Sequence, residues 1–354
     1  MLPNFLAKLV RPEILRITGY QSARTLTKAA QIQLDANENT FGTVLPNFPK
    51  LKLQCYPDPL ATALRYQLAQ YLKVPTEQIL VGNGSDELIG LITTTFVAAR
   101  EGVLLPEPTF AYYADNAKLR GASLQQFWLP DFKFNVAKVL RQIRAKTKII
   151  FLCSPNNPTG QIIPLAAISE ICRQSQKIVV VDEAYIEFAP QFSAAALLKK
   201  FPNLIILRTF SKAWGLAGLR LGYLLADARL VAILRKVRAP YSVNTLSAYL
   251  AGQALARQKQ VARLTQKIIL AREEFFQDLQ KLNLRVFPSQ ANFLLIEFPT
   301  KFSAPNFQKK LLRELDIAVR VFPQEPRLQN FWRVTVGKPE QNKKVVRFLQ
   351  QNLN

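Results

Sequence analysis

The amino-acid sequence predicts an α/β protein with a mainly parallel sheet flanked by helices, followed by a smaller α+β part. Short apolar runs recur between residues 78 and 207, and helical stretches separate them. This alternation is typical of parallel strands joined by right-handed crossovers. Each run ends in polar or glycine-rich residues, and ligands of such sheets bind beyond the carboxyl ends of the strands. After about residue 239 the pattern changes to longer helices and a few separate strands.

The first elements of the chain are an N-terminal arm over residues 1–35 and a helix over residues 61–72, with turns between them. A short strand over residues 78–81 precedes a tight glycine turn and a helix that runs to residue 97. We predict Ser85 as the N-cap of this helix. Free N–H groups at a helix start form an anion site. Asp86 and Glu87 leave open the alternative that the start is only a capped helix.

Four further features follow the next strands, which we predict over residues 102–105, 148–152, 177–181 and 204–207. A rigid proline turn that ends in Phe110 follows the first of these strands. Asn157 and Asp182 follow the next two, and Lys212 lies soon after the last. Because the carboxyl ends of parallel strands meet at one edge of the sheet, we expect Ser85, Asn157, Asp182 and Lys212 to gather in one site.

Lys212 lies between an apolar run and a stretch of small residues that ends in Arg220. A lysine becomes a nucleophile when it is partly desolvated or lies near another cation. Hydroxyl groups from Thr209 and Ser211, together with an arginine, also suit a phosphate. By itself this stretch slightly favours a solvated lysine in a glycine-rich turn.

The wider set of residues reverses that preference. A carboxylate at the end of a buried strand, such as Asp182, is costly unless it faces a cation. It can hold a ring nitrogen protonated, while Asn157 and Tyr185 can hydrogen-bond a phenolate oxygen. With a phosphate cradle and a lysine that can form an imine, these are the parts of a pyridoxal phosphate site.

The C-terminal part is predicted to contain helices over residues 246–256, 261–282, 307–315 and 343–349, and strands over residues 284–286, 292–298 and 331–336. We divide the chain into an arm (1–35), a large cofactor-binding domain (36–240), and interdomain helices with a small C-terminal domain (241–354). The prediction places the site mainly in the large domain.

Composition limits the function further. The 354 residues include 47 Lys and Arg against 24 Asp and Glu, which gives a formal charge of +23. This charge attracts anions, but the basic residues are spread along the chain and form no nucleic-acid-binding signature. No apolar run reaches the length of a membrane span, and no convincing signal peptide is present. We expect a cytoplasmic protein without a membrane or a specific nucleic-acid partner.

The sequence contains no histidine and only three cysteines: Cys55, Cys153 and Cys172. A Ser-His-Asp catalytic triad is therefore impossible, and we expect no metal site. General acid–base catalysis near neutral pH must use Lys, Tyr, Cys, Asp or Glu. Three widely spaced cysteines suit a reducing compartment better than a disulfide framework.

The order of these motifs resembles the fold-type I pyridoxal-phosphate-dependent aminotransferases and, more narrowly, the histidinol-phosphate aminotransferase family. The matching segments are residues 20–24, 34–39 with Gly42, 56–59, 82–87, 154–160, 181–185, 211–212 with 217–220, and 333–337. They extend across nearly the whole chain. The resemblance implies pyridoxal 5'-phosphate as cofactor, small anionic substrates and a homodimer.

The resemblance also implies residue roles. Lys212, Asp182 and Tyr185 would be the catalytic groups: Lys212 would bond covalently to the cofactor, and Asp182 would pair with its ring nitrogen. Asn157 and Tyr185 would contact the ring oxygen, and Phe110 would stack on the ring. The residues implied around the cofactor phosphate are Ser85, Asp86, Thr209, Ser211, Arg220 and, from the neighbouring subunit, Tyr56. Those implied on the substrate side are Tyr20, Asn37, Arg320 and Arg333.

Within this resemblance the expected reaction joins imidazole acetol phosphate and L-glutamate to give L-histidinol phosphate and 2-oxoglutarate. Three alternatives stay open at this point. Two share the fold: an aminotransferase of aromatic amino acids and a phosphothreonine decarboxylase. The third is a basic nucleic-acid-binding protein on an inactive aminotransferase fold, against which the presence of Lys212, Asp182 and Arg220 counts.

Overall fold

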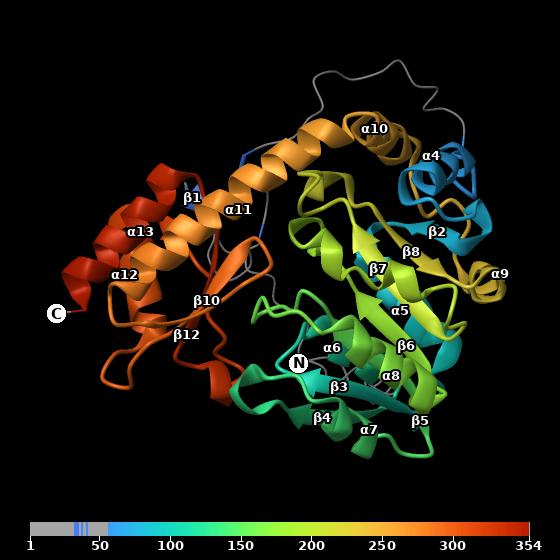
Figure 1. Cartoon of the computed structure of the whole chain (residues 1–354), viewed down its shortest axis with the longest axis horizontal. Coiled ribbons are helices and arrows are strands. Elements are labelled where there is room, and N and C mark those ends of the chain that lie inside the picture. The colour runs from blue at the N-terminus through green and yellow to red at the C-terminus, as the bar shows by residue number, and fades with distance from the viewer. Residues whose placement is uncertain (1–31, 35–36, 38–39, 42–55, 354) are drawn as a thin grey trace, which may run out of the picture.

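A seven-stranded sheet forms the larger part of the molecule (Figure 1). The computed structural model describes residues 32–34, 37, 40–41 and 56–353. The strand order is β2-β8-β7-β6-β5-β3-β4. The strands are β2 (Ile79–Gly82), β3 (Gly102–Glu107), β4 (Ser123–Trp128), β5 (Thr147–Cys153), β6 (Ile178–Asp182), β7 (Leu204–Thr209) and β8 (Gly222–Ala226).

Strand β8 is antiparallel to both of its neighbours, β2 and β7, whereas the pairs between β7 and β4 are parallel. The reversal follows from the connection, because the twelve residues between β7 and β8 form no helical crossover of the kind that a parallel neighbour needs. This connection carries Lys212. The predicted α/β fold with a mainly parallel sheet is confirmed, although strands β4 and β8 were not predicted.

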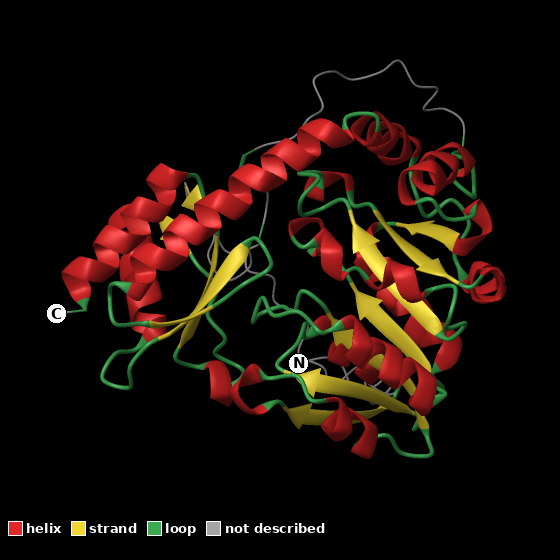
Figure 2. Cartoon of the chain, in the orientation of Figure 1, coloured by secondary structure: helices red, strands yellow, loops and turns green. Residues whose placement is uncertain are grey.

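Helices cover both faces of this sheet (Figure 2). One face packs against α4 (Thr62–Leu72), α7 (Val136–Arg141), α8 (Leu165–Ser175) and α10 (Thr245–Leu255), and the other against α5 (Gly84–Phe96), α6 (Tyr112–Leu119) and α9 (Ala228–Val237). Successive strand residues point to opposite faces. In β6, Val179 and Val181 therefore join the first core and Val180 joins the second. Burial on both faces explains why the central strands β5, β6 and β7 are mostly apolar.

The C-terminal part has its own core around a three-stranded antiparallel sheet of order β12-β10-β9. The long helix α11 (Gln258–Gln280) runs from α10 to this sheet (Figure 1). Its other elements are β9 (Arg285–Phe287), β10 (Phe293–Glu297), α12 (Ala304–Leu315), β11 (Ile317–Ala318), β12 (Phe331–Thr335) and α13 (Pro339–Asn352). Strand β1 (Ile32–Gln33) pairs in parallel with β11, so this piece of the predicted arm belongs to the C-terminal part.

The predicted N-cap at Ser85 is wrong. Helix α5 begins at Gly84, and its N-cap is Asn83. The Glu87 carboxylate accepts a hydrogen bond from the Asn83 backbone N–H. This hydrogen bond caps the helix at Asn83, two residues before Ser85. Ser85 consequently lies in the first turn, where backbone N–H groups have no partner within the helix.

The domain boundaries stay a prediction. Of the helices in the described ranges, none is both long and apolar enough to cross a bilayer.

Candidate active site

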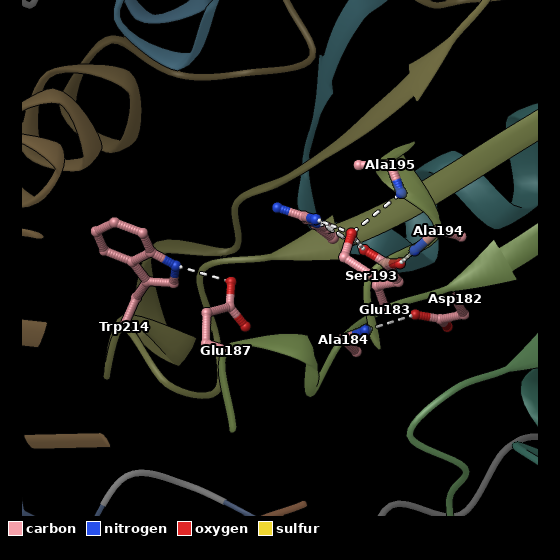
Figure 3. A network of polar contacts seen from close by, with 9 residues as sticks. Asp182, Glu183, Ala184, Glu187, Ser193, Ala194, Ala195 and Trp214 are labelled. Atoms are coloured by element: carbon pink, nitrogen blue, oxygen red, sulfur yellow. Dashed lines mark hydrogen bonds and ion pairs between the residues drawn. The ribbon is translucent and has the colours of Figure 1, made fainter. Parts of the chain in front are cut away.

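Asp182, at the end of β6, is a buried carboxylate with 4% of its surface exposed. The Tyr113 hydroxyl donates to its Oδ2 (2.6 Å), and the Ala184 N–H donates to its Oδ1 (3.0 Å; Figure 3). Burial raises the pKa of Asp182 to about 6, although both hydrogen bonds oppose the rise. A cation placed beside this carboxylate would favour its charged form. The geometry therefore suits a group that binds as a cation.

Tyr113 is the functional residue that sequence reasoning missed. Its buried ring stacks on Phe151 at 4.7 Å and meets Phe110 edge-on at 5.5 Å. The available signal was its position three residues after Phe110, in the first turn of the helix that follows the proline turn. Tyr113 thus orients the Asp182 carboxylate and packs against the predicted stacking residue.

Lys212 lies on the connection between β7 and β8, and its Nζ is 5.8 Å from the centre of the Tyr185 ring. The Tyr185 hydroxyl accepts a hydrogen bond from Nδ2 of Asn37 (3.0 Å). Burial raises the pKa of Tyr185, so the phenol stays protonated at neutral pH. The phenol therefore retains a proton that it can donate to an oxyanion.

Glycine allows the start of α5 to approach β7 and β8 closely. Gly222 pairs with Thr209 on one side and with Gly82 on the other. A Cβ at Gly222 would lie 2.6 Å from the Ser85 backbone nitrogen, so any other residue would force these segments apart. Strand pairing thus brings the N-terminal turn of α5 beside Thr209.

The same place gathers several hydrogen-bond donors. The hydroxyls of Thr209 and Ser211 lie 3.0 Å apart, and the Ser211 N–H donates to Thr209 Oγ1 (3.1 Å). Arg220 donates through Nη2 to Asp86 Oδ2 (2.8 Å), which holds the guanidinium near the helix start. A Cβ at Gly84 would lie 2.9 Å from that nitrogen. Backbone N–H groups, hydroxyls and a guanidinium together form a cradle suited to phosphate.

Two arginines from the C-terminal part complete the described site. Arg333, in β12, donates through Nη1 to Oδ1 of Asn157 (2.5 Å), and its guanidinium lies over the Phe293 ring at 5.4 Å. Backbone hydrogen bonds of 2.9 and 3.1 Å pair Arg333 with Arg320. Side chains that are directly opposite on antiparallel strands point to the same face. This arrangement suits an anionic substrate group.

Most of the predicted site residues are therefore linked by direct contacts. Asn37 contacts Tyr185, Asn157 contacts Arg333, and Lys212 lies beside Tyr185. Asp182 and Phe110 are joined through Tyr113. Tyr56 takes part in none of these contacts: 85% of its surface is exposed, and its ring stacks on Tyr241 at 4.8 Å. Tyr20 lies outside the described residues. The roles assigned to these residues stay predictions.

Comparison with known proteins identifies the family. The family model described as aminotransferase class I and II matches residues 29–349. Histidinol-phosphate aminotransferase from Xanthomonas campestris pv. campestris is 41% identical, covering 97% of this chain and 96% of that protein. The enzyme of that name from Caldanaerobacter subterraneus subsp. tengcongensis is 38% identical, covering 98% and 99%.

Solved structures confirm the predicted fold type. Histidinol-phosphate aminotransferase from Sinorhizobium meliloti, in complex with pyridoxal-5'-phosphate, superposes with a TM-score of 0.88 at 24% identity, covering 97% of each chain. The enzyme of that name from Clostridium acetobutylicum superposes with a TM-score of 0.83 at 26% identity, covering 91% of this chain and 99% of its own. The chain therefore belongs to the class I and II aminotransferases and, among them, to the histidinol-phosphate aminotransferase family.

Proposed function

We propose that this chain transfers the amino group of L-glutamate to imidazole acetol phosphate, which gives L-histidinol phosphate and 2-oxoglutarate in L-histidine biosynthesis. The observation that carries the proposal is the identity of 38–41% to enzymes of that name over at least 97% of this chain. The three alternatives are an aromatic aminotransferase, a phosphothreonine decarboxylase and a nucleic-acid-binding protein. The relatives cited above carry the name of none of them, so these alternatives have less support than the proposed reaction.

The described residues fit pyridoxal 5'-phosphate as cofactor. Asp182 would face the ring nitrogen, because its carboxylate is buried and a cation would compensate its charge. Asn157 and Tyr185 would hydrogen-bond the ring oxygen, and Phe110 would lie against the ring. The cradle would bind the phosphate through Ser85, Asp86, Thr209, Ser211 and Arg220.

When bound, this cofactor supplies an electron-withdrawing ring that stabilises negative charge on the substrate Cα. Lys212 would supply the covalent anchor and then the amine that accepts the proton from the Cα of the amino donor and, in the reverse half-reaction, gives a proton to the Cα of the amino acceptor. Lys212 lies next to Tyr185, on the loop that follows β7, the strand that ends in Thr209. This position supports the role. Asp182 would keep the ring nitrogen protonated.

Arg333 and Arg320 would bind the anionic groups of the two substrates. An arginine fork fits both carboxylate and phosphate, so one pair of side chains can serve a dicarboxylate and a phosphorylated alcohol in turn. Asn37 and Tyr20 would lie on the same side. The formal charge of +23 would raise the local concentration of both anionic substrates.

Competing substrates test the proposed reaction. We expect the purified holoenzyme to transaminate histidinol phosphate with 2-oxoglutarate at a kcat/KM at least about tenfold above its value for phenylalanine or tyrosine, since only the first carries a phosphate for the arginine pair. Phosphothreonine should lose no CO₂. A higher kcat/KM for phenylalanine or tyrosine would favour the aromatic aminotransferase, and CO₂ release would favour the decarboxylase.

We also propose a cytoplasmic homodimer in which Tyr56 reaches the cofactor phosphate of the partner subunit. One observation supports a role outside its own subunit: 85% of the surface of Tyr56 is exposed. Tyr66 on α4 and Tyr249 on α10 are also exposed, and these two helices pack together. A two-fold interface would bring Tyr56 of each subunit to the other, so both sites would be composite. The buried free thiols of Cys153 and Cys172 suit the reducing cytoplasm.

Complementation tests the composite site. We expect an inactive Lys212→Ala chain mixed with a Tyr56→Ala chain to regain activity, because one site of each mixed dimer is free of both changes. A chain carrying both changes, mixed with wild type, is the control and should restore nothing beyond the wild-type activity present. Tyr56→Phe should weaken cofactor retention by about 1–3 kcal/mol, as expected for a hydrogen bond to a charged group. Mixed dimers with no regained activity would show that Tyr56 does not act in the partner.

A further inference from the structure

A cavity lies between α11 and the segments that follow β6 and β7, and no step of the proposed reaction uses it. Its volume is about 320 Å³, within the range of small-molecule sites. Its walls include Tyr71 at the end of α4, Glu187 in the 3₁₀ turn η3 (Ile186–Phe188), Trp214, and Thr265 of α11. Neither Lys212 nor Asp182 is among the described residues that line it.

Glu187 presents a carboxylate oxygen that lacks a protein partner. Its Oε1 accepts a hydrogen bond from the Trp214 indole N–H at 3.1 Å (Figure 3). Its Oε2 is buried and has no hydrogen-bond partner among the described residues. On α11, the buried Oγ1 of Thr265 has no such partner either. Buried polar atoms of this kind are costly unless a further group satisfies them.

The other charges around Glu187 are already matched. Arg208 forms an ion pair with Glu183 at 2.8 Å and donates through Nη2 to Ser193 at 2.7 Å, while the Ala194 N–H donates to Glu183 (Figure 3). The titratable groups that act on Glu187 are Arg208, Glu183, Tyr71 and Tyr223. From α11 the cavity is lined only by uncharged residues. Arg208 also lines the cavity and attracts Glu187. Glu187 is the acid among the described lining residues, and its Oε2 accepts no hydrogen bond from them.

The side walls supply aromatic surface next to that acid. Tyr71 and Trp214 meet edge-to-face with their ring centres 5.6 Å apart. Aromatic rings attract cations, and a carboxylate beside them strengthens the preference. We propose that this cavity is a binding site for a small organic cation that carries N–H donors, such as a primary ammonium compound. Its N–H groups donate to Glu187 Oε2, and its carbon body packs against Tyr71 and Trp214.

Calorimetric titration of the holoenzyme with butylammonium chloride tests the proposal. We expect one site per chain and no binding of butyrate, the anion of similar size. Burial raises the pKa of Glu187 to about 7. The carboxyl is then about one-tenth ionised at pH 6 and nine-tenths at pH 8, whereas the amine stays protonated at both. The affinity should therefore be about tenfold higher at pH 8 than at pH 6.

Two variants alter different walls of the cavity. Glu187→Gln can keep the hydrogen bond from Trp214 but removes the charge, and it should weaken binding at pH 8 at least about tenfold. Thr265→Met fills the cavity from α11 and should abolish binding while transaminase activity is retained, which also keeps the test valid if Glu187→Gln fails to fold. Glu274→Gln, an exposed change on the same helix, is the control and should bind like wild type. Absence of binding to wild type, equal binding of butyrate, or wild-type affinity in Thr265→Met would each overturn the proposal.

Discussion

Replacing Lys212 with alanine should lower kcat by about 10⁴-fold or more, because the chain then lacks the amine that moves the proton at the substrate Cα. Lys212 lies on the connection between β7 and β8, beside Tyr185. Its side chain is only partly buried, so the variant should fold and melt near the wild-type temperature. Steady-state kinetics with L-glutamate and imidazole acetol phosphate measures the loss.

A covalent label locates the anchor independently of activity. Borohydride reduction of the wild-type holoenzyme, followed by peptide mapping, should place one cofactor on Lys212. Lys199→Ala is the matched control, since Lys199 is exposed, and this variant should keep both label and activity. A label on another lysine, or no label after reconstitution with cofactor, would contradict the role of Lys212.

The second large effect concerns Asp182. Asp182→Ala should lower kcat far more than cofactor affinity, because the phosphate cradle is separate from this carboxylate. Loss of one partner of a buried charge pair costs about 3–5 kcal/mol, which corresponds to about 10²- to 10⁴-fold in kcat when it is felt in the transition state. Cofactor affinity is measured by titrating the apoenzyme. Near-normal turnover would rule out the proposed pairing with the ring nitrogen.

Tyr113→Phe separates the charge of Asp182 from its hydrogen bond. The Tyr113 hydroxyl donates to the carboxylate at 2.6 Å and lowers its pKa. Without this bond the pKa should rise further, so the carboxylate becomes protonated at a higher pH. The acid limb of the kcat profile should then move toward neutral pH by about 1–2 units, as expected for a hydrogen bond to a charged group. An unmoved acid limb would show that Tyr113 only packs against Phe151.

Much of the fold was predictable from local sequence patterns. The buried strands β5, β6 and β7 are short, apolar and rich in β-branched residues, and polar residues follow each of them. Strand β4 gave a weaker signal because its residues are mostly exposed or half-buried and include two glutamines. Strand β8 follows the glycine-rich Lys212 loop, and only its pairing with β2 and β7 shows that the chain turns back there.

The sequence by itself determined which chemical groups this protein carries and that most of them follow strand ends: Asp182 after β6, Asn157 after β5 and Lys212 after β7. Only the tertiary structure decided which of these groups touch. Tyr113 meets Asp182 across 69 residues, and Arg333 meets Asn157 across 176. The physical reason is that residue spacing sets the face of a helix or strand, whereas these contacts also depend on how α6 packs on the sheet and how β12 faces it. In the same way, the contact of α11 with η3 brings Thr265 and Glu187 to one cavity.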